Sequence, residues 1–379
     1  MSFIQKASVK LWNQVAMSDS GQYQTAVEAS TQVGSNFYGY VWISSDYGNT
    51  WTSKYTYKSW TYLAMSSSGQ YQLITDDSQL SVSNDYGNTW TQKVTDLFSE
   101  VSMSSSGQYQ LSAAYGSYIW VSSDYGNTWN YKSTKMNWQY STMSSSGQYQ
   151  TAVEDTNVNN TGYIWVSSDY GNTWNQKASL LDWYIVACSN SGQYQTALED
   201  TDLLSNGLWV SNDYGNTWTL KESQNWNYIT MSGSGQYQIA PVYGSNISYI
   251  STDYGNTWVS TVQNYWESVL FSTTGQTQVA LCTSVDFTVE AVQVSYDFGN
   301  TWSTQNFLSP PSSCALSPDG NFITIAGYPD YIYVHASTNT IPWIYKNGQW
   351  NIVTHSFKRI GGQWVSAKNC QELISGAWQ

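Results

Sequence analysis

Hydrophobic and polar residues alternate with a period of two through much of this 379-residue chain. The segment Tyr163-Ile-Trp-Val-Ser167 shows the pattern, and Gly, Asn, Asp and Ser gather where such segments end. Alternation of this kind indicates strands whose two faces differ, and the clustered turn residues indicate tight connections between them. The pattern therefore predicts an all-β fold of short antiparallel strands.

One turn motif, S-x-D-[YF]-G-N-T-W, interrupts this pattern seven times. Its aspartates are spaced 39 to 45 residues apart, close to the roughly 40–45 residues of a four-stranded propeller blade. The motif aspartates are Asp46, Asp85, Asp124, Asp169, Asp213, Asp253 and Asp297. A repeat of this length indicates that one unit of four strands, here called A to D, is copied around the fold.

A second motif runs out of phase with the first and adds an eighth copy. Met17-Ser-Asp-Ser-Gly-Gln-Tyr-Gln24 recurs from Met65, Met103, Met143, Cys188, Met231 and Phe271, and more weakly from Leu316. An aromatic residue stands five positions before each of the first seven starts. Strand A carries this aromatic, the Ser-Gly turn leads to strand B, a variable loop leads to strand C, and the Asp turn leads to strand D. We therefore predict an eight-bladed propeller of four-stranded blades, with seven blades as the alternative.

The N-terminal segment predicts how the ring closes. Phe3-Ile-Gln-Lys-Ala-Ser8 matches the strand D segment 174–179, whereas the eighth unit, at roughly 311–336, has strands A to C but no Asp turn. We expect residues 3–8 to pair with the strand near 331–336, because closure removes exposed sheet edges. In the alternative, Trp343-Ile-Tyr-Lys346 completes the eighth blade.

The repeats end near residue 337, so we predict a propeller at 1–337 and a separate module at 338–379. Three turn signals in this tail, Asn347-Gly348, Gly361-Gly362 and Ser375-Gly376, each precede a Trp and predict a small three-hairpin module. Hairpins of this size bury little apolar surface alone. We therefore expect residues 338–379 to dock onto other structural proteins or further copies of the chain.

Charge and targeting signals narrow the possible partners. The chain has 26 acidic and 13 basic residues, which disfavours binding to nucleic acid or an acidic membrane. No apolar run approaches the roughly 18–20 residues of a membrane span, and the N-terminus lacks the apolar core of a signal peptide. We expect a virion or extracellular location after release, with a cytoplasmic location as the alternative.

The cysteines have no metal-type spacing, so we expect free thiols and no cofactor: Cys188, Cys282, Cys314 and Cys370.

The Asp turn resembles the Asp-box, or bacterial neuraminidase repeat, of sialidases, sortilin-type receptors and other propellers. The resemblance covers residues 41–302 densely. It implies that the turns lie between strands C and D, away from the ligand-binding face, and that the seven aspartates are structural rather than catalytic. Turn chemistry agrees, because a carboxylate can accept bonds from turn amides, Gly tolerates positive φ, and Trp can pack between sheets.

The sialidase members of this family clamp their substrate with three arginines, and lysine cannot reproduce that bidentate geometry. This chain has one arginine, Arg359, outside the predicted propeller. The sequence therefore indicates a non-sialidase member of the Asp-box family.

Two groups of residues are candidates for ligand binding on the face that carries the B–C loops. Acids at the ends of strand B could serve sugar binding or glycoside hydrolysis; they are Glu28, Asp76, Asp77, Glu154, Asp155, Glu199 and Asp200. Of these, we keep Glu154, Asp155, Glu199 and Asp200 as candidate ligand-binding residues. They recur in equivalent blades, which favours solvated loop acids over a catalytic pair. Aromatics that do not recur could stack on sugars or simply be exposed: Tyr38, Tyr55, Tyr57, Tyr115 and Tyr243. We predict no catalytic and no metal-binding residue.

Three functions follow from these patterns. We favour a non-enzymatic structural or attachment protein of a virus or phage, since the few Lys and Arg and the abundant Ser, Asn, Gln, Tyr and Trp are similar to viral surface and tail proteins. The second is a carbohydrate-binding propeller whose partners are surface glycans. The third is a glycoside hydrolase other than a sialidase.

Overall fold

The computed structural model divides the chain into two compact units, residues 1–335 and 336–379. The structure describes residues 3–29, 31–33, 36–56, 60–76, 78–155, 162–178, 181–199, 206–262, 265–283, 290–307 and 309–336, followed by four short strands within the second unit. Among these residues, no helix is long and apolar enough to cross a membrane.

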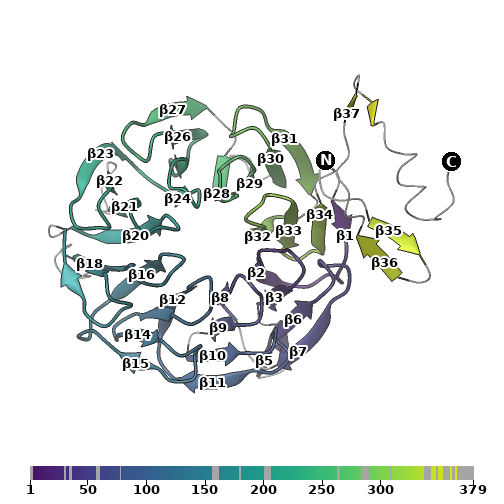
Figure 1. Cartoon of the computed structure of the whole chain (residues 1–379), viewed down its shortest axis with the longest axis horizontal. Helices are drawn as coiled ribbons and strands as arrows, with labels where there is room; N and C mark the ends of the chain where they lie inside the picture. Colours follow the sequence, from purple (N-terminus) through teal and green to yellow (C-terminus); the bar gives the residue numbers. More distant parts are fainter. Residues whose placement is uncertain are drawn as a thin grey trace. The chain divides into compact units, whose positions relative to one another are not determined.

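Eight four-stranded antiparallel sheets surround a central axis, as Figure 1 shows. Blade 1 consists of β2 (Trp12–Met17), β3 (Gln24–Glu28), β6 (Tyr40–Ser44) and β7 (Thr52–Thr56), and blade 2 of β8 (Tyr62–Met65), β9 (Gln72–Asp76), β10 (Gln79–Ser83) and β11 (Thr91–Val94). Blade 3 consists of β12 (Phe98–Met103), β13 (Gln110–Ala114), β14 (Ile119–Ser122) and β15 (Asn130–Tyr131), and blade 4 of β16 (Trp138–Met143), β17 (Gln150–Glu154), β18 (Ile164–Ser167) and β19 (Asn175–Gln176).

The remaining four blades repeat this order. Blade 5 consists of β20 (Trp183–Cys188), β21 (Gln195–Glu199), β22 (Asn206–Ser211) and β23 (Thr219–Gln224), and blade 6 of β24 (Thr230–Met231), β25 (Gln238–Pro241), β26 (Ile247–Ser251) and β27 (Val259–Val262). Blade 7 consists of β28 (Tyr265–Phe271), β29 (Gln278–Thr283), β30 (Glu290–Ser295) and β31 (Ser303–Phe307), and blade 8 of β32 (Pro311–Leu316), β33 (Phe322–Gly327), β34 (Ile332–Ala336) and β1 (Ile4–Gln5). The prediction of an eight-bladed, all-β propeller is confirmed.

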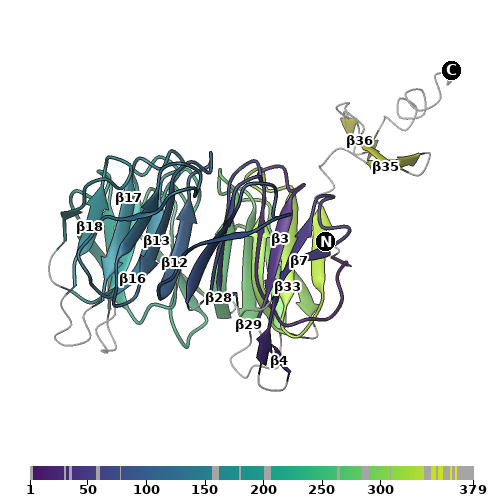
Figure 2. The ribbon, with the colours of Figure 1, turned by 90° about the horizontal axis from the view of Figure 1, so that it is seen from below.

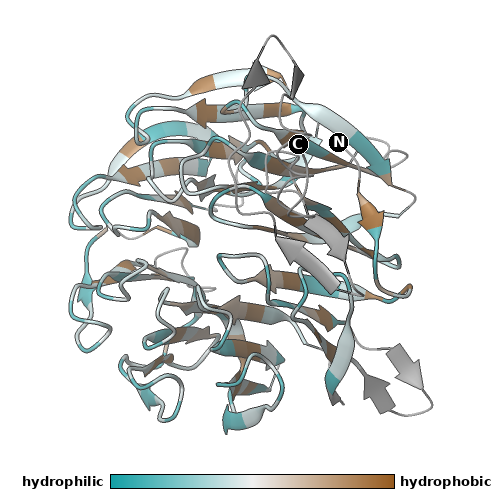
Figure 3. Cartoon of the chain, turned by 45° about the vertical axis from the view of Figure 1, so that its right-hand side comes forward, coloured by the Kyte–Doolittle hydropathy of each residue, from teal (hydrophilic) through white to brown (hydrophobic). Residues whose placement is uncertain are grey.

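Burial explains the order of strands in each blade. Strand A is innermost, and the inner strands of neighbouring blades contact one another. Strand B lies between two other strands of its own sheet and is buried at every residue in blades 1 to 4. Figure 3 shows hydrophobic segments within the strands and hydrophilic segments in the turns. The core is therefore made of apolar side chains packed between neighbouring sheets.

The N-terminal segment closes the ring as predicted. Ile4 of β1 pairs with Val334 of β34, Gln5 pairs with Tyr333, and the Lys6 amide donates to the Ile332 carbonyl at 2.8 Å. Segment 343–346 does not complete the eighth blade: as β35 (Trp343–Lys346) it pairs with β36 (Gln349–Ile352). Blade 8 therefore combines three strands from one end of the sequence with one from the other.

Short hairpins outside the blades account for the remaining strands. The variable loop of blade 1 forms a hairpin of β4 (Thr31–Val33) and β5 (Asn36–Tyr38), which extends past the ends of the blade strands in Figure 2. In the second unit, β35–β36 and the pair β37 (Arg359–Ile360) and β38 (Gln363–Trp364) occupy two of the three predicted hairpins. The third, around Ser375-Gly376, lies outside the described residues.

The Asp turns have the hydrogen bonds that the sequence predicts. In blade 3, Asp124 Oδ1 accepts from the Thr128 amide at 2.9 Å and from Ser122 Oγ at 2.9 Å, and Oδ2 accepts from Thr128 Oγ1 at 2.7 Å. Gly126 takes a φ of +79°. Burial alone would raise the pKa of Asp124, but the bonds from Thr128 and Ser122 outweigh it and lower the pKa. These turns therefore hold ionised carboxylates in structural roles.

The aromatic residue of each Asp turn also has a left-handed backbone, which turn chemistry does not predict for a residue with a Cβ. Tyr170 has a φ of +63° although it carries a Cβ. Its ring stacks on Tyr109 at the start of strand B in the preceding blade, with centroids 4.4 Å apart. Equivalent pairs join Tyr23–Tyr86, Tyr71–Tyr125, Tyr149–Tyr214, Tyr194–Tyr254, Tyr237–Phe298 and, across the ring closure, Phe322–Tyr47. Contact with the neighbouring blade therefore offsets the strain of the left-handed backbone.

Hydrogen bonds also join the blades near their A–B turns. The Ser67 amide of blade 2 donates to the Ser105 carbonyl of blade 3 at 2.9 Å, and the Ser105 amide donates to the Ser145 carbonyl of blade 4 at 2.9 Å. At the ring closure, Thr324 Oγ1 of blade 8 donates to Gln24 Oε1 of blade 1 at 2.8 Å. The seam is thus joined by side chains as well as by β1.

Candidate functional site

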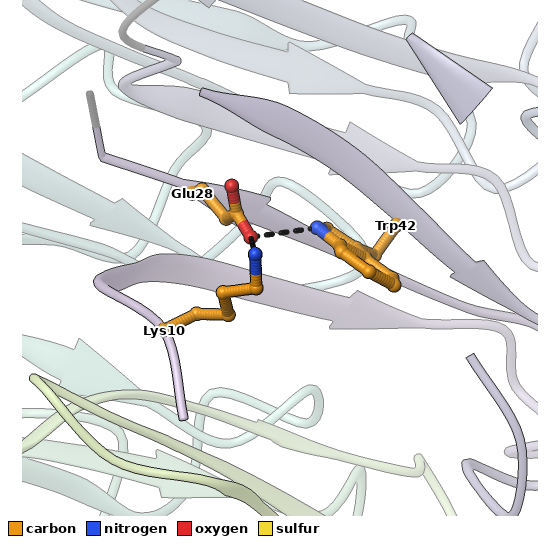
Figure 4. Close-up of polar contacts among 3 residues, drawn as sticks. All are labelled: Lys10, Glu28 and Trp42. Carbon is orange, nitrogen blue, oxygen red and sulfur yellow. Dashed lines mark hydrogen bonds and ion pairs between the residues drawn. The ribbon is translucent and has the colours of Figure 1, made fainter. Parts of the chain in front are cut away.

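Glu28, at the end of β3, is the best-defined of the predicted loop acids. Its Oε1 accepts a hydrogen bond from Trp42 Nε1 at 2.9 Å and forms an ion pair with Lys10 Nζ at 3.2 Å (Figure 4). The Lys10 ammonium also lies 5.3 Å from the centroid of the Trp42 ring and 5.7 Å from that of Tyr40. The carboxylate is buried, and its charge is compensated by a cation.

Two further strand C tryptophans make the same contact with an acid of strand B. Trp165 Nε1 donates to Glu154 at 3.1 Å, and Trp209 Nε1 donates to Glu199 at 2.8 Å. In blade 3, strand B ends at Ala114 and offers no carboxylate there. Asp96, which precedes strand A, accepts from Trp120 Nε1 at 2.8 Å instead. A buried indole N–H without a partner is costly, so these acids have a structural function within the blade.

The other predicted acids lie in separate surroundings. Asp76 Oδ1 accepts from the backbone amides of Ser78 and Gln79, at 2.7 and 2.9 Å, and so fixes a turn. Asp155 is buried and accepts from Gln139 Nε2 at 3.2 Å. Asp77 and Asp200 lie outside the described residues. None of these contacts places two carboxylates opposite one open site.

The predicted tyrosines are dispersed as well. Tyr243, beside β25, is 62% exposed, and its amide donates to the Asn225 carbonyl at 2.6 Å. Tyr115 is partly buried in the loop between β13 and β14. The structure places the backbones of Tyr38 and Tyr55 in β5 and β7 but does not describe their side chains, and Tyr57 lies outside the described residues. Ligand binding by these residues stays a prediction.

A cluster on the propeller axis was not predicted. Glu100 on β12 interacts electrostatically with Tyr140 on β16 and with Tyr228, which immediately precedes β24. Tyr140 and Tyr228 also interact with each other. Blades 3, 4 and 6 supply these side chains, and blades 3 and 6 are not neighbours. The interaction of Glu100 with Tyr228 therefore joins inner strands that are not adjacent in the ring.

The electrostatics of this axial cluster, Glu100, Tyr140 and Tyr228, reflect its enclosure. Burial raises the pKa of Glu100 from 4.5 to about 8, although a hydrogen bond from the Val101 amide lowers it. The Glu100 carboxylate and burial hold the pKa of Tyr140 well above 10.0, and burial raises that of Tyr228 to about 12. All three side chains nevertheless keep partial solvent exposure, as expected for groups that face an enclosed axis.

One position of the repeat marks this cluster in the sequence. The second residue after the strand A aromatic, or after the Pro that replaces it, is Gln14, Tyr62, Glu100, Tyr140, Ile185, Tyr228, Ser268 or Ser313. The position is therefore chemically diverse where most of the repeat is constant. The predicted candidates lie instead at strand B ends and in loops. The sequence does not show which of these eight residues interact, because that depends on the geometry of the ring.

The thiols show no sign of activation. Cys188, Cys282 and Cys314 are free, and burial raises the pKa of each to about 12. They are consequently protonated and weakly nucleophilic near neutral pH. Cys370 is not among the described residues, and within those residues no group of three or more His, Cys, Asp or Glu side chains could hold a metal ion.

Comparison with known proteins agrees with the fold. The BNR-Asp box repeat family matches residues 164–177, the strand C, Asp turn and strand D of blade 4. A sequence comparison with curated proteins finds no match.

Solved propellers resemble the chain in structure. They include the Dos1 propeller (TM-score 0.67, 13% identity, 88% of this chain and 94% of that one), YCF48 from Cyanidioschyzon merolae (0.53, 12%, 79% and 99%) and the hydrazine synthase of Kuenenia stuttgartiensis (0.53, 16%, 88% and 97%). Identities this low establish a shared fold and nothing further. Together with the eight blades, they show that the chain is a β-propeller, and the matched segment shows that it contains a BNR-Asp box repeat.

Proposed function

We propose that the chain is a non-enzymatic structural or attachment protein, of the kind found on a virus or phage, that uses its propeller as a rigid display scaffold. The observation that carries the proposal is the engagement of the strand B acids. Glu28, Glu154 and Glu199 each accept a hydrogen bond from a strand C indole. A glycoside hydrolase needs two carboxylates that face one sugar, and side chains held in this way stabilise a blade instead.

Rigidity supports a display role. Seven aromatic pairs, the amide bonds between A–B turns and the β1 closure join successive blades around the ring. Surface loops on such a frame can vary without loss of the core. In this proposal, residues 338–379 dock the scaffold onto other structural proteins or onto further copies of the chain.

Truncation tests the proposal. We expect the full chain to assemble with other copies or with a structural partner, as measured by light scattering after size exclusion. We expect residues 1–337 to remain folded, with the circular dichroism spectrum of a β protein, and not to assemble. Full-length protein should also release no sugar from a panel of glycans. Normal assembly by the truncated chain, or failure of that chain to fold, would contradict the docking role, and glycan turnover would contradict the non-enzymatic assignment.

A carbohydrate-binding propeller is the second candidate, and the exposure of Tyr243 favours it. An exposed tyrosine offers a flat ring to the apolar face of a sugar. Loss of a glycan-array signal in Tyr243→Ala, with the signal retained in Tyr131→Ala, would support this candidate, because Tyr131 is similarly exposed but lies on an outer strand. Equal signals in the two variants would exclude Tyr243 as a sugar contact.

A further inference from the structure

Glu100 is enclosed on the axis without a cationic neighbour among the described residues. Its recorded hydrogen bond comes from the Val101 amide, with 3.1 Å between the amide nitrogen and Oε1. The titratable groups that interact with it are the phenols of Tyr140 and Tyr228. By contrast, Glu28 is paired with Lys10. An ionised carboxylate so enclosed requires a compensating positive charge.

The groups around this pair of tyrosines are aromatic or neutral. Tyr62 on β8 interacts with Tyr140, while Tyr184 on β20 and Cys314 on β32 interact with Tyr228. Tyr140 and Tyr228 also pack against the apolar core of blade 5, which includes Ile185. Tyr140 and Tyr228 thus link one carboxylate to tyrosines of other blades.

This combination has a defined binding chemistry. Tyrosine rings attract organic cations through their negative faces, and aromatic cages recognise quaternary ammonium groups. A carboxylate beside the rings supplies the opposite charge. Tyr184 is 45% exposed, so the cluster extends to a side chain in contact with solvent. The net charge of the chain, −13, also favours the approach of cations.

We propose that the axial cluster of Glu100, Tyr140 and Tyr228 is a binding site for a small organic ammonium ion. The rings of Tyr140 and Tyr228 contact the alkyl ammonium surface, and the Glu100 carboxylate neutralises its charge. No covalent step is involved. The carboxylate is specific to blade 3, because the equivalent positions of the other seven blades carry no acidic side chain.

Binding and proton release are coupled in this site. The pKa of about 8 means that Glu100 is largely protonated at pH 6 and largely ionised at pH 9. The phenols stay protonated at both values, since the pKa values of Tyr140 and Tyr228 are raised. The ammonium ion binds the ionised form, so affinity increases with pH and binding near pH 7 releases a proton.

Calorimetry with choline tests the proposal, with 3,3-dimethylbutanol as the neutral analogue of similar shape. We expect full-length protein to bind choline at least about tenfold more tightly at pH 9 than at pH 6, from the change in the ionised fraction. Choline should also bind at least about tenfold more tightly than the alcohol. Near pH 7, the measured enthalpy should depend on the ionisation enthalpy of the buffer, which reports the released proton.

Two variants and a control locate the site. Glu100→Gln keeps the side-chain shape and should weaken choline binding at pH 9 by about tenfold or more, and Tyr140→Leu should weaken it through loss of the ring. Glu267→Gln, on the inner strand of blade 7, removes an equal charge from an exposed position and should leave binding unchanged. Thermal unfolding checks that each variant folds. The proposal is wrong if choline does not bind at pH 9, if the alcohol binds equally well, or if Glu100→Gln binds choline as the unmodified chain does.

Discussion

The left-handed pair of an aromatic residue and a glycine in each Asp turn shows how single residues share the cost of a tight bend. Gly171 adopts a φ of +80° without a side chain to hinder it, but Tyr170, at +63°, does so with a full side chain. Turn chemistry alone explains the glycine. The tyrosine depends on the stacked ring of Tyr109 in another blade, which no local rule could reveal.

Replacement of one turn aspartate isolates the contribution of its carboxylate. Asp124→Ala leaves the Thr128 amide and hydroxyl without their acceptor, so we expect the free energy of unfolding to fall by about 1–3 kcal/mol. Urea denaturation measures this change. Ser123→Ala, one residue earlier at an exposed position, is the matched control and should change stability little. An unchanged midpoint for Asp124→Ala would show that the turn does not depend on its carboxylate.

At the level of strands and turns, two departures from the repeat belong together. Blade 8 has no Asp turn, so it offers no turn aromatic to the blade before it. The position in blade 7 that would stack on that aromatic is Thr277, whereas the preceding blade has Tyr237 there. The sequence shows both losses, and the structure explains why they coincide.

The short β1 strand is the element that completes blade 8. Deletion of residues 1–8 removes its pairing with β34 and the Lys6 hydrogen bond, and it exposes the edge of β34 to other chains. We expect a loss of about 1–3 kcal/mol, from a few backbone hydrogen bonds, together with concentration-dependent aggregation. Thermal unfolding and light scattering measure these effects. Deletion of residues 1–2 alone, which precede β1, is the control and should change neither; equal behaviour of the two deletions would show that β1 does not close the ring.

For the whole propeller, opposite pKa shifts predict how stability varies with pH. Hydrogen bonds lower the pKa values of six turn aspartates, Asp85, Asp124, Asp169, Asp213, Asp253 and Asp297. Their contribution is present above the unfolded-state pKa of about 4 and is lost as the pH falls through the lower folded-state values. We therefore expect the midpoint of urea unfolding to fall steeply in acid.

Glu100 acts in the opposite direction. Its pKa of about 8 in the folded state exceeds the ordinary value of 4.5, so the folded chain retains a proton that the unfolded chain releases. Stability should accordingly decrease as the pH rises from about 4.5 to 8 and then level off. Glu100→Gln removes this dependence, and its stability relative to the unmodified chain should increase over that range. A difference that is constant with pH would show that Glu100 titrates normally.

The sequence by itself determined the blade count, the four strands of each blade, the Asp turns and the closure by residues 3–8. These features depend on period and turn chemistry, which are local and repeated, so each copy reinforces the others. Only the tertiary structure decided which side chains of distant blades meet. Glu28, Glu154 and Glu199 looked like loop acids because their indole partners lie on another strand, and Glu100 meets Tyr228 only because eight blades curve around one axis.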